Sequence, residues 1–219
     1  MVSAIVSAAV ATMPIPVPTP AQLRYQQQEI VALTHFNMAT FFRDGDPACD
    51  ASNWERSQKP SSFAPTHLNV SNWIESYKAV GAKSGILTAK HGCGFLLWPT
   101  KVKLPDGSNY AYHVGGEGGL GVDIAAMYVK EMRAAGLRPS FYYSLKDSFY
   151  LNAIADSVRP PSTTLPGQVN VTQDQFEEVS VAAVSELWSQ YGELAEIWFD
   201  GGAAWRRSCF CALAGCGCP

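Results

Sequence analysis

The strongest constraint on the fold of this 219-residue chain is the alternation of short apolar segments with longer amphipathic ones. The apolar segments are rich in β-favouring residues, and the segments between them repeat apolar residues at helical spacing. This pattern predicts strands at residues 30–42, 85–90, 138–144 and 194–199, with helices at residues 71–80, 123–135 and 172–191. Thr172 is the expected N-cap of the last helix, and prolines exclude a helix from residues 14–20. Nearly all-apolar strands that alternate with helices indicate a parallel sheet covered by helices, so the predicted class is α/β.

Two parallel architectures fit this order, a (β/α)8 barrel and an open doubly wound sheet, and both bind ligands at the carboxyl ends of their strands. His35, His91, Tyr143 and Asp200 stand at such ends. No G-x-G-x-x-G or G-x-x-x-x-G-K-[ST] motif follows the first strand, which disfavours an open nucleotide-binding sheet. We therefore expect a partial (β/α)8 TIM-like barrel with about four βα units, truncated after the fourth strand.

In the segment from Glu196 to Gly202, the carboxylate of Asp200 stands beside two aromatic residues and two glycines. Strand alternation turns Ile197 and Phe199 toward a core and turns Trp198 and Asp200 the other way. A carboxylate in that position can attack the anomeric carbon of a sugar. An aspartate that caps a turn after a buried strand is the alternative, and these seven residues alone leave both readings open.

The composition limits the partners. A hydrophobic content of 47% suits a buried core, while a net charge of -3 without a Lys/Arg run disfavours nucleic acid and anionic membranes. The expected ligand is a neutral small molecule, and no cofactor is expected. Cys209, Cys211, Cys216 and Cys218 crowd the tail, but they lack the usual zinc spacing and have no histidine nearby, so we predict no metal.

Residues 1–18 are interpreted as a signal remnant or a disordered N-terminus, because they are Ala/Val-rich but lack a basic start. Two N-glycosylation sequons begin at Asn69 and Asn170. They favour a secreted, vacuolar or lysosomal location.

Taken together, the strand-end residues resemble the α-L-fucosidases of glycoside hydrolase family 29, particularly the plant and protist branch. The matching segments stand in family order between residues 19 and 202, and each alone is a weak pattern. They comprise residues 19–24, 34–41, 81–83, 87–100, 141–144 and 196–202.

The resemblance implies a barrel-like catalytic domain and retaining hydrolysis of terminal α-L-fucosyl linkages, with fucosylated oligosaccharides or glycoconjugates as substrates. It places the nucleophile at Asp200 and the sugar-binding histidines at His35 and His91. Tyr143 matches the family's strand-three tyrosine, and Trp198 matches the indole beside the nucleophile.

The chain departs from the family pattern in three places. Gly92 and Cys93 stand where the family has a second histidine and an aspartate. The family's acid/base is a glutamate beyond the fourth strand, which leaves Glu55 as a weak candidate here. Residues 203–219 form an atypical Cys/Gly-rich tail. We therefore interpret residues 19–202 as the N-terminal half of a catalytic barrel in a fragment, whose open sheet edges favour self-association.

Three functions remain open at this point. The first is a fucosidase, and the second is a non-catalytic fucose-binding remnant of the same fold. The third is a metal-dependent hydrolase that uses the strand-end histidines, which the lack of an H-x-H pair on the first strand disfavours.

Overall fold

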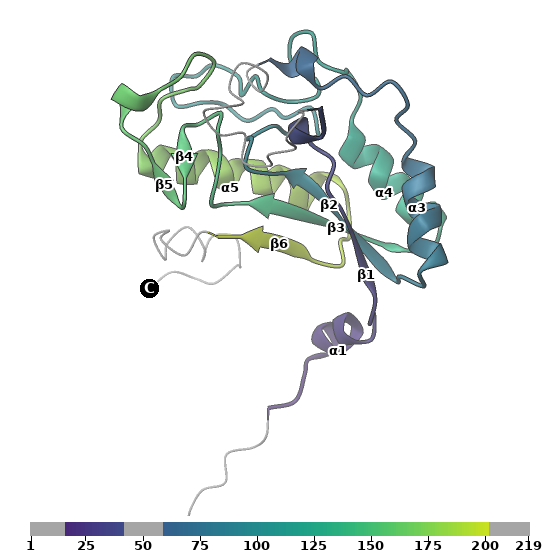
Figure 1. The fold of residues 1–219 in the computed structure, drawn as a ribbon. Helices are drawn as coiled ribbons and strands as arrows, with labels where there is room; N and C mark the ends of the chain where they lie inside the picture. The colour runs from purple at the N-terminus through teal and green to yellow at the C-terminus, as the bar shows by residue number, and fades with distance from the viewer. Residues whose placement is uncertain (1–15, 42–58, 202–219) are drawn as a thin grey trace, which may run out of the picture.

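The computed structural model describes residues 16–41 and 59–201 and contains one four-stranded parallel sheet. Its strands follow the order β1-β2-β3-β6 (Figure 1). They are β1 (Val31–Thr34), β2 (Ser84–Lys90), β3 (Arg138–Ser144) and β6 (Ile197–Asp200). The α/β class and the parallel sheet predicted from the sequence are confirmed. Because all four strands run in the same direction, their carboxyl ends lie at the same end of the sheet.

Three helices connect these strands and cover one face of the sheet (Figure 1). They are α3 (Val70–Ala79), α4 (Ile124–Ala134) and α5 (Gln173–Gln190). Each helix has an N-cap residue whose side chain accepts a hydrogen bond from a backbone N–H of the first turn. The N-caps of α3, α4 and α5 are Asn69, Asp123 and Thr172, respectively. The predicted N-cap at Thr172 is confirmed, and Gln175 completes a capping box there.

The main core lies between this sheet face and the helices. The Phe141 ring of β3 packs against Tyr128 of α4 and against Tyr191, which follows α5. Gly85 of β2 lies so close to the helices that an added Cβ would sit 2.4 Å from the ring of Tyr77 in α3. Alternate residues of β2 and β3 therefore pack against the helices, and the residues between them point to the opposite face of the sheet.

Two local predictions are wrong, and one element was missed. The first strand ends at Thr34 instead of continuing to residue 42, because the side chain of Asn37 accepts the N–H of Ala39 and starts the 3-10 helix η1 (Met38–Phe41). The prolines do not exclude a helix throughout residues 14–20, since Pro20 opens α1 (Pro20–Gln26) at a position where no N–H is needed. A hairpin of β4 (Ala153–Ile154) and β5 (Ser157–Val158) was not predicted.

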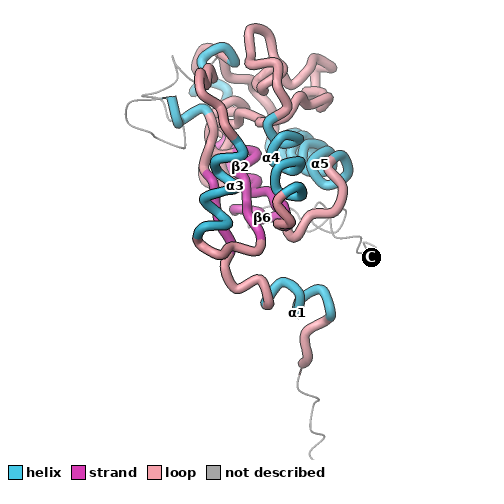
Figure 2. Tube along the Cα trace, turned by 90° about the vertical axis from the view of Figure 1, so that its right-hand side faces the viewer, coloured by secondary structure: helices cyan, strands magenta, loops and turns pink. Residues whose placement is uncertain are grey.

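The remaining elements are short. The 3-10 helices η2 (Pro60–Ser62) and η3 (Pro161–Thr163) lie in the loops. Figures 1 and 2 show α1 apart from the three covering helices, below the sheet. Apart from residues 16–18, the predicted N-terminal segment lies outside the described residues, as does the tail at 203–219. None of the helices in the described part of the chain is long and apolar enough to cross a bilayer.

Candidate functional site

Four polar or aromatic side chains meet at the carboxyl ends of the sheet strands. The rings of His35 and His91 lie edge to face with 5.2 Å between their centroids. The ring of Tyr142 stacks on His91 at 5.4 Å, and its hydroxyl donates a hydrogen bond to Oδ2 of Asp200. The structure thus brings together two imidazoles and one carboxylate from β1, β2 and β6, linked by a tyrosine from β3.

The backbone around the histidines is held by packing and by a tight turn. Just after His35, the N–H of Phe36 donates to Oγ1 of Thr88 in β2 at 3.3 Å, and the Phe36 ring packs on Phe63 and Trp73. After His91 the chain turns back at Gly94, whose φ of 80° and lack of room for a Cβ require glycine. Both imidazoles are therefore placed by rigid neighbours.

The carboxylate of Asp200 is oriented by Tyr142. Burial, assisted by the hydrogen bond to Asp200, raises the pKa of Tyr142, so this phenol stays protonated and remains a donor. On the backbone side, the carbonyl of Asp200 accepts the N–H groups of Leu145 at 2.8 Å and Lys146 at 3.1 Å. Asp200 is thus held at both its main chain and its side chain.

Tyr143 does not join this group, although the sequence analysis placed it with the other candidate site residues. In the parallel register, Tyr142 pairs with Trp198 and Tyr143 pairs with Phe199, so the two tyrosines point to opposite faces. Tyr143 is only 3% exposed, and Ser180 and Glu186 of α5 are its polar neighbours. Tyr142 is the residue that the sequence reasoning missed. No signal in the sequence alone selects Tyr142, because the choice between two adjacent tyrosines depends on the register of β3 with β6.

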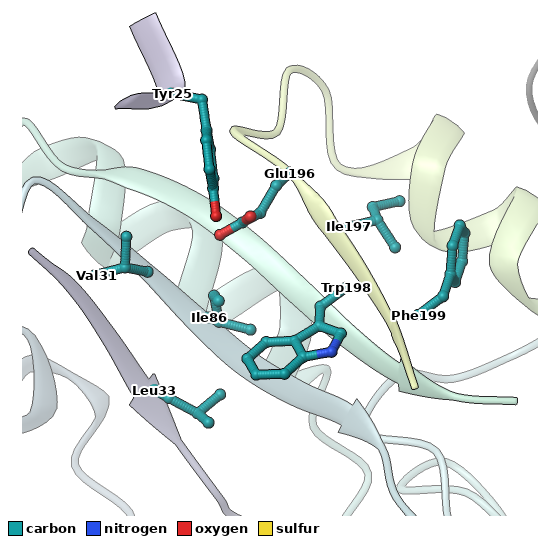
Figure 3. Close-up of a pocket in the computed structure, with 8 residues that line it drawn as sticks. All are labelled: Tyr25, Val31, Leu33, Ile86, Glu196, Ile197, Trp198 and Phe199. Atoms are coloured by element: carbon teal, nitrogen blue, oxygen red, sulfur yellow. The ribbon is translucent and has the colours of Figure 1, made fainter. Parts of the chain in front are cut away.

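Trp198 connects the polar group to an open cavity on the uncovered face of the sheet. Its indole packs edge to face on Tyr142 at 5.7 Å and is 46% exposed. The cavity has a volume of about 560 Å³, and apolar side chains of β1, β2 and β6 line most of it. In Figure 3, Tyr25 of α1 points its hydroxyl at the carboxylate of Glu196 at one end of this cavity.

The other predicted residues have different outcomes. Glu55 lies outside the described residues. Cys93 is disulfide-bonded and 1% exposed, so it offers no free thiol. Within the described ranges, no cluster of three or more His, Cys, Asp or Glu side chains could hold a metal ion.

This arrangement is that of a parallel α/β protein whose carboxylate-and-imidazole site lies at the strand ends, as in barrel-type glycoside hydrolases. The sequence profile described as alpha-L-fucosidase matches residues 24–209. Alpha-L-fucosidase 1 of Arabidopsis thaliana is 28% identical over 82% of this chain and 30% of its own length. A solved glycoside hydrolase 29 family member from an unknown rumen bacterium is 28% identical, with a TM-score of 0.62 over 85% of this chain and 28% of that one.

A fold likeness extends to alpha-L-fucosidase AlfC from Lactobacillus casei, solved in complex with alpha-L-fucose product. It is 19% identical, with a TM-score of 0.66 over 87% of this chain and 64% of that one. The chain belongs to the alpha-L-fucosidase family, glycoside hydrolase family 29. It spans about 30% of the length of the plant relative that it matches.

Proposed function

We propose that this chain carries the nucleophile-bearing part of a retaining α-L-fucosidase site, for terminal α-L-fucosyl groups of oligosaccharides or glycoconjugates. The observation that supports this most is the Asp200 carboxylate, held by the Tyr142 hydroxyl beside the paired rings of His35 and His91. A fucosyl unit offers hydroxyls to the imidazoles and its C–H and methyl groups to the aromatic faces. Family membership makes this the first function to test.

In the proposed reaction, a carboxylate oxygen of Asp200 attacks C1 of the fucosyl unit while the bond from C1 to the leaving oxygen breaks. The product is a covalent fucosyl ester of Asp200, which water then hydrolyses. Tyr142 orients the attacking oxygen, and His35 and His91 hold sugar hydroxyls. The leaving oxygen must receive a proton from a second carboxyl group. Glu55 remains the sequence-based candidate for that acid/base. The alternative is a glutamate beyond the fourth strand, where the family pattern has it.

A fucosyl fluoride with fluorine at C2 tests the nucleophile without the acid/base, because fluoride leaves without a proton. We expect the intact protein to gain one 2-fluoro-fucosyl group by mass spectrometry, and the Asp200→Asn variant to gain none. An equal gain in Asp200→Asn would reject Asp200 as the nucleophile. If the wild-type chain takes up no label but still binds fucose in calorimetry, the non-catalytic fucose-binding remnant is the correct reading.

We also propose that the protein passes through an oxidising, secretory compartment. The disulfide at Cys93 supports this, because such bonds persist mainly in secreted and luminal proteins. The sequon residues Asn69 and Asn170 are both exposed and accessible to glycosylation. Protein expressed in a eukaryotic secretory host should lose mass on treatment with an N-glycan-cleaving amidase, and unchanged mass would count against the proposal.

We also propose that the protein associates with itself. β1 and β6 are the edge strands of the sheet, and Leu33 and Trp198 on them are 42% and 46% exposed. Exposed apolar side chains on edge strands favour pairing with another chain. Sedimentation velocity should show a concentration-dependent rise in mass, which a strictly monomeric profile would contradict.

A further inference from the structure

Lys90, at the end of β2, is a buried cation that the proposed reaction does not use. Its side chain is 1% exposed, and its ammonium donates to the carbonyl of Ser144 at 2.6 Å and to the carbonyl of Asp147. It also lies 5.1 Å from the centroid of the Tyr143 ring. Burying an ammonium is costly, so a fully buried lysine needs a reason beyond packing.

The two carbonyls that Lys90 binds bracket the turn that holds Asp200. Ser144 is the register partner of Asp200 in the sheet. Between Ser144 and Asp147, the N–H groups of Leu145 and Lys146 donate to the Asp200 carbonyl. Lys90 therefore binds both ends of the four-residue turn from Ser144 to Asp147. The two middle residues of this turn bind the backbone carbonyl of Asp200.

The charge of Lys90 also reaches the carboxylate. Burial lowers the pKa of Lys90 to about 7, and the negative charges of Asp147 and Asp200 raise it against that effect. These two carboxylates come from the turn after β3 and from β6. Tyr143 of β3 presents its ring to the ammonium, and His91 directly follows Lys90 after the end of β2. The Lys90 ammonium and the Asp200 carboxylate therefore interact electrostatically.

We propose that Lys90 is a positioning residue for Asp200: its ammonium fixes the turn that binds the Asp200 backbone, and its charge is coupled to that of the Asp200 carboxylate. The inference rests on the proposed function for its catalytic consequence. Its physical content, the coupling between Lys90 and Asp200, does not depend on catalysis.

The first test follows the rate of labelling by the 2-fluoro-fucosyl fluoride from pH 5.5 to 8.5. Lys90→Met removes the charge at similar length, Lys90→Arg keeps a permanent charge, and Lys83→Met removes an exposed lysine before the other end of β2. We expect Lys90→Met to label about tenfold more slowly than wild type at pH 6. The difference should narrow by pH 8.5, because wild-type Lys90 loses its charge but keeps N–H donors for the turn. Lys90→Arg should outpace wild type at pH 8.5, and Lys83→Met should match wild type throughout.

A wild-type to Lys90→Met rate ratio that is constant with pH would overturn the electrostatic part of the inference, and equal rates at every pH would overturn all of it. The second test needs no activity and uses NMR to titrate the Lys90 side chain. Removing the Asp200 charge in Asp200→Asn should lower the Lys90 titration midpoint by about half a unit or more. An unchanged midpoint would refute the coupling. If wild type takes up no label, the proposed function fails while this titration still decides the role of Lys90.

Discussion

Replacing Tyr142 with phenylalanine removes the hydroxyl that holds Asp200 and keeps the ring that packs on His91 and Trp198. A hydrogen bond to a charged group contributes roughly 1.5–3 kcal/mol. Since about 1.4 kcal/mol corresponds to a factor of ten in rate, we expect covalent labelling to slow by about 10- to 100-fold.

Tyr143→Phe is the matched control for this change. It removes a hydroxyl one position away on the helix-facing side of β3 and leaves the ring beside Lys90 in place. Labelling should proceed at the wild-type rate in this variant, with the rate constants measured by intact-mass time courses at one pH. Equal rates for Tyr142→Phe and wild type, or equal losses in both variants, would refute the assignment of Tyr142.

Three further changes test other parts of the account. The carboxylate of Glu186 accepts hydrogen bonds from the Trp98 indole, the Thr100 hydroxyl and the Lys101 N–H, so Glu186→Ala should lower the free energy of unfolding in urea by about 2–4 kcal/mol. A loss below about 0.5 kcal/mol would count against that role. Because the pKa of Lys90 falls from 10.5 to about 7 on folding, the unfolded chain binds more protons between these values, so the Lys90 contribution makes stability rise with pH there. Urea unfolding at pH 6.5 and 9.5 should show this rise reduced in Lys90→Met, and an identical rise would contradict it. His91→Ala should weaken fucose binding in calorimetry by about tenfold, the effect of one lost sugar contact, and unchanged affinity would remove His91 from the site.

The elements with periodic sequence signals could be predicted. The helix that begins after Thr172 carries both a capping box and an inward apolar face, and Phe176 and Leu187 on that face are fully buried. β2 and β3 are apolar runs bounded by polar residues, and their predicted limits are correct to within one residue. Here local propensity and tertiary packing favour the same structure.

The failures have local physical causes. The β4–β5 hairpin turns at Ala155 and Asp156 with positive φ values of 53° and 65°, and this pair lacks the Asn-Gly or Asp-Gly signal that such a turn usually carries. The first strand ends through a side-chain contact of Asn37 that hydrophobic periodicity does not register.

The meeting of His35, His91 and Asp200 could be predicted because each stands at the end of a strand, and the structure brings the three together through Tyr142. Tyr142 could be chosen over Tyr143 only once the pairing of β3 with β6 was known, because adjacent strand residues face opposite sides. Lys90 was missed because its importance arises from the turn at Ser144 to Asp147, which the sheet brings close from more than fifty residues away.

The most direct test of the central claim is a crystal structure of the chain after reaction with the 2-fluoro-fucosyl fluoride. The account predicts continuous density from a carboxylate oxygen of Asp200 to C1 of the sugar, with sugar hydroxyls within hydrogen-bond distance of His35 and His91. Density for the sugar on another carboxylate, or at a position that neither imidazole reaches, would contradict it.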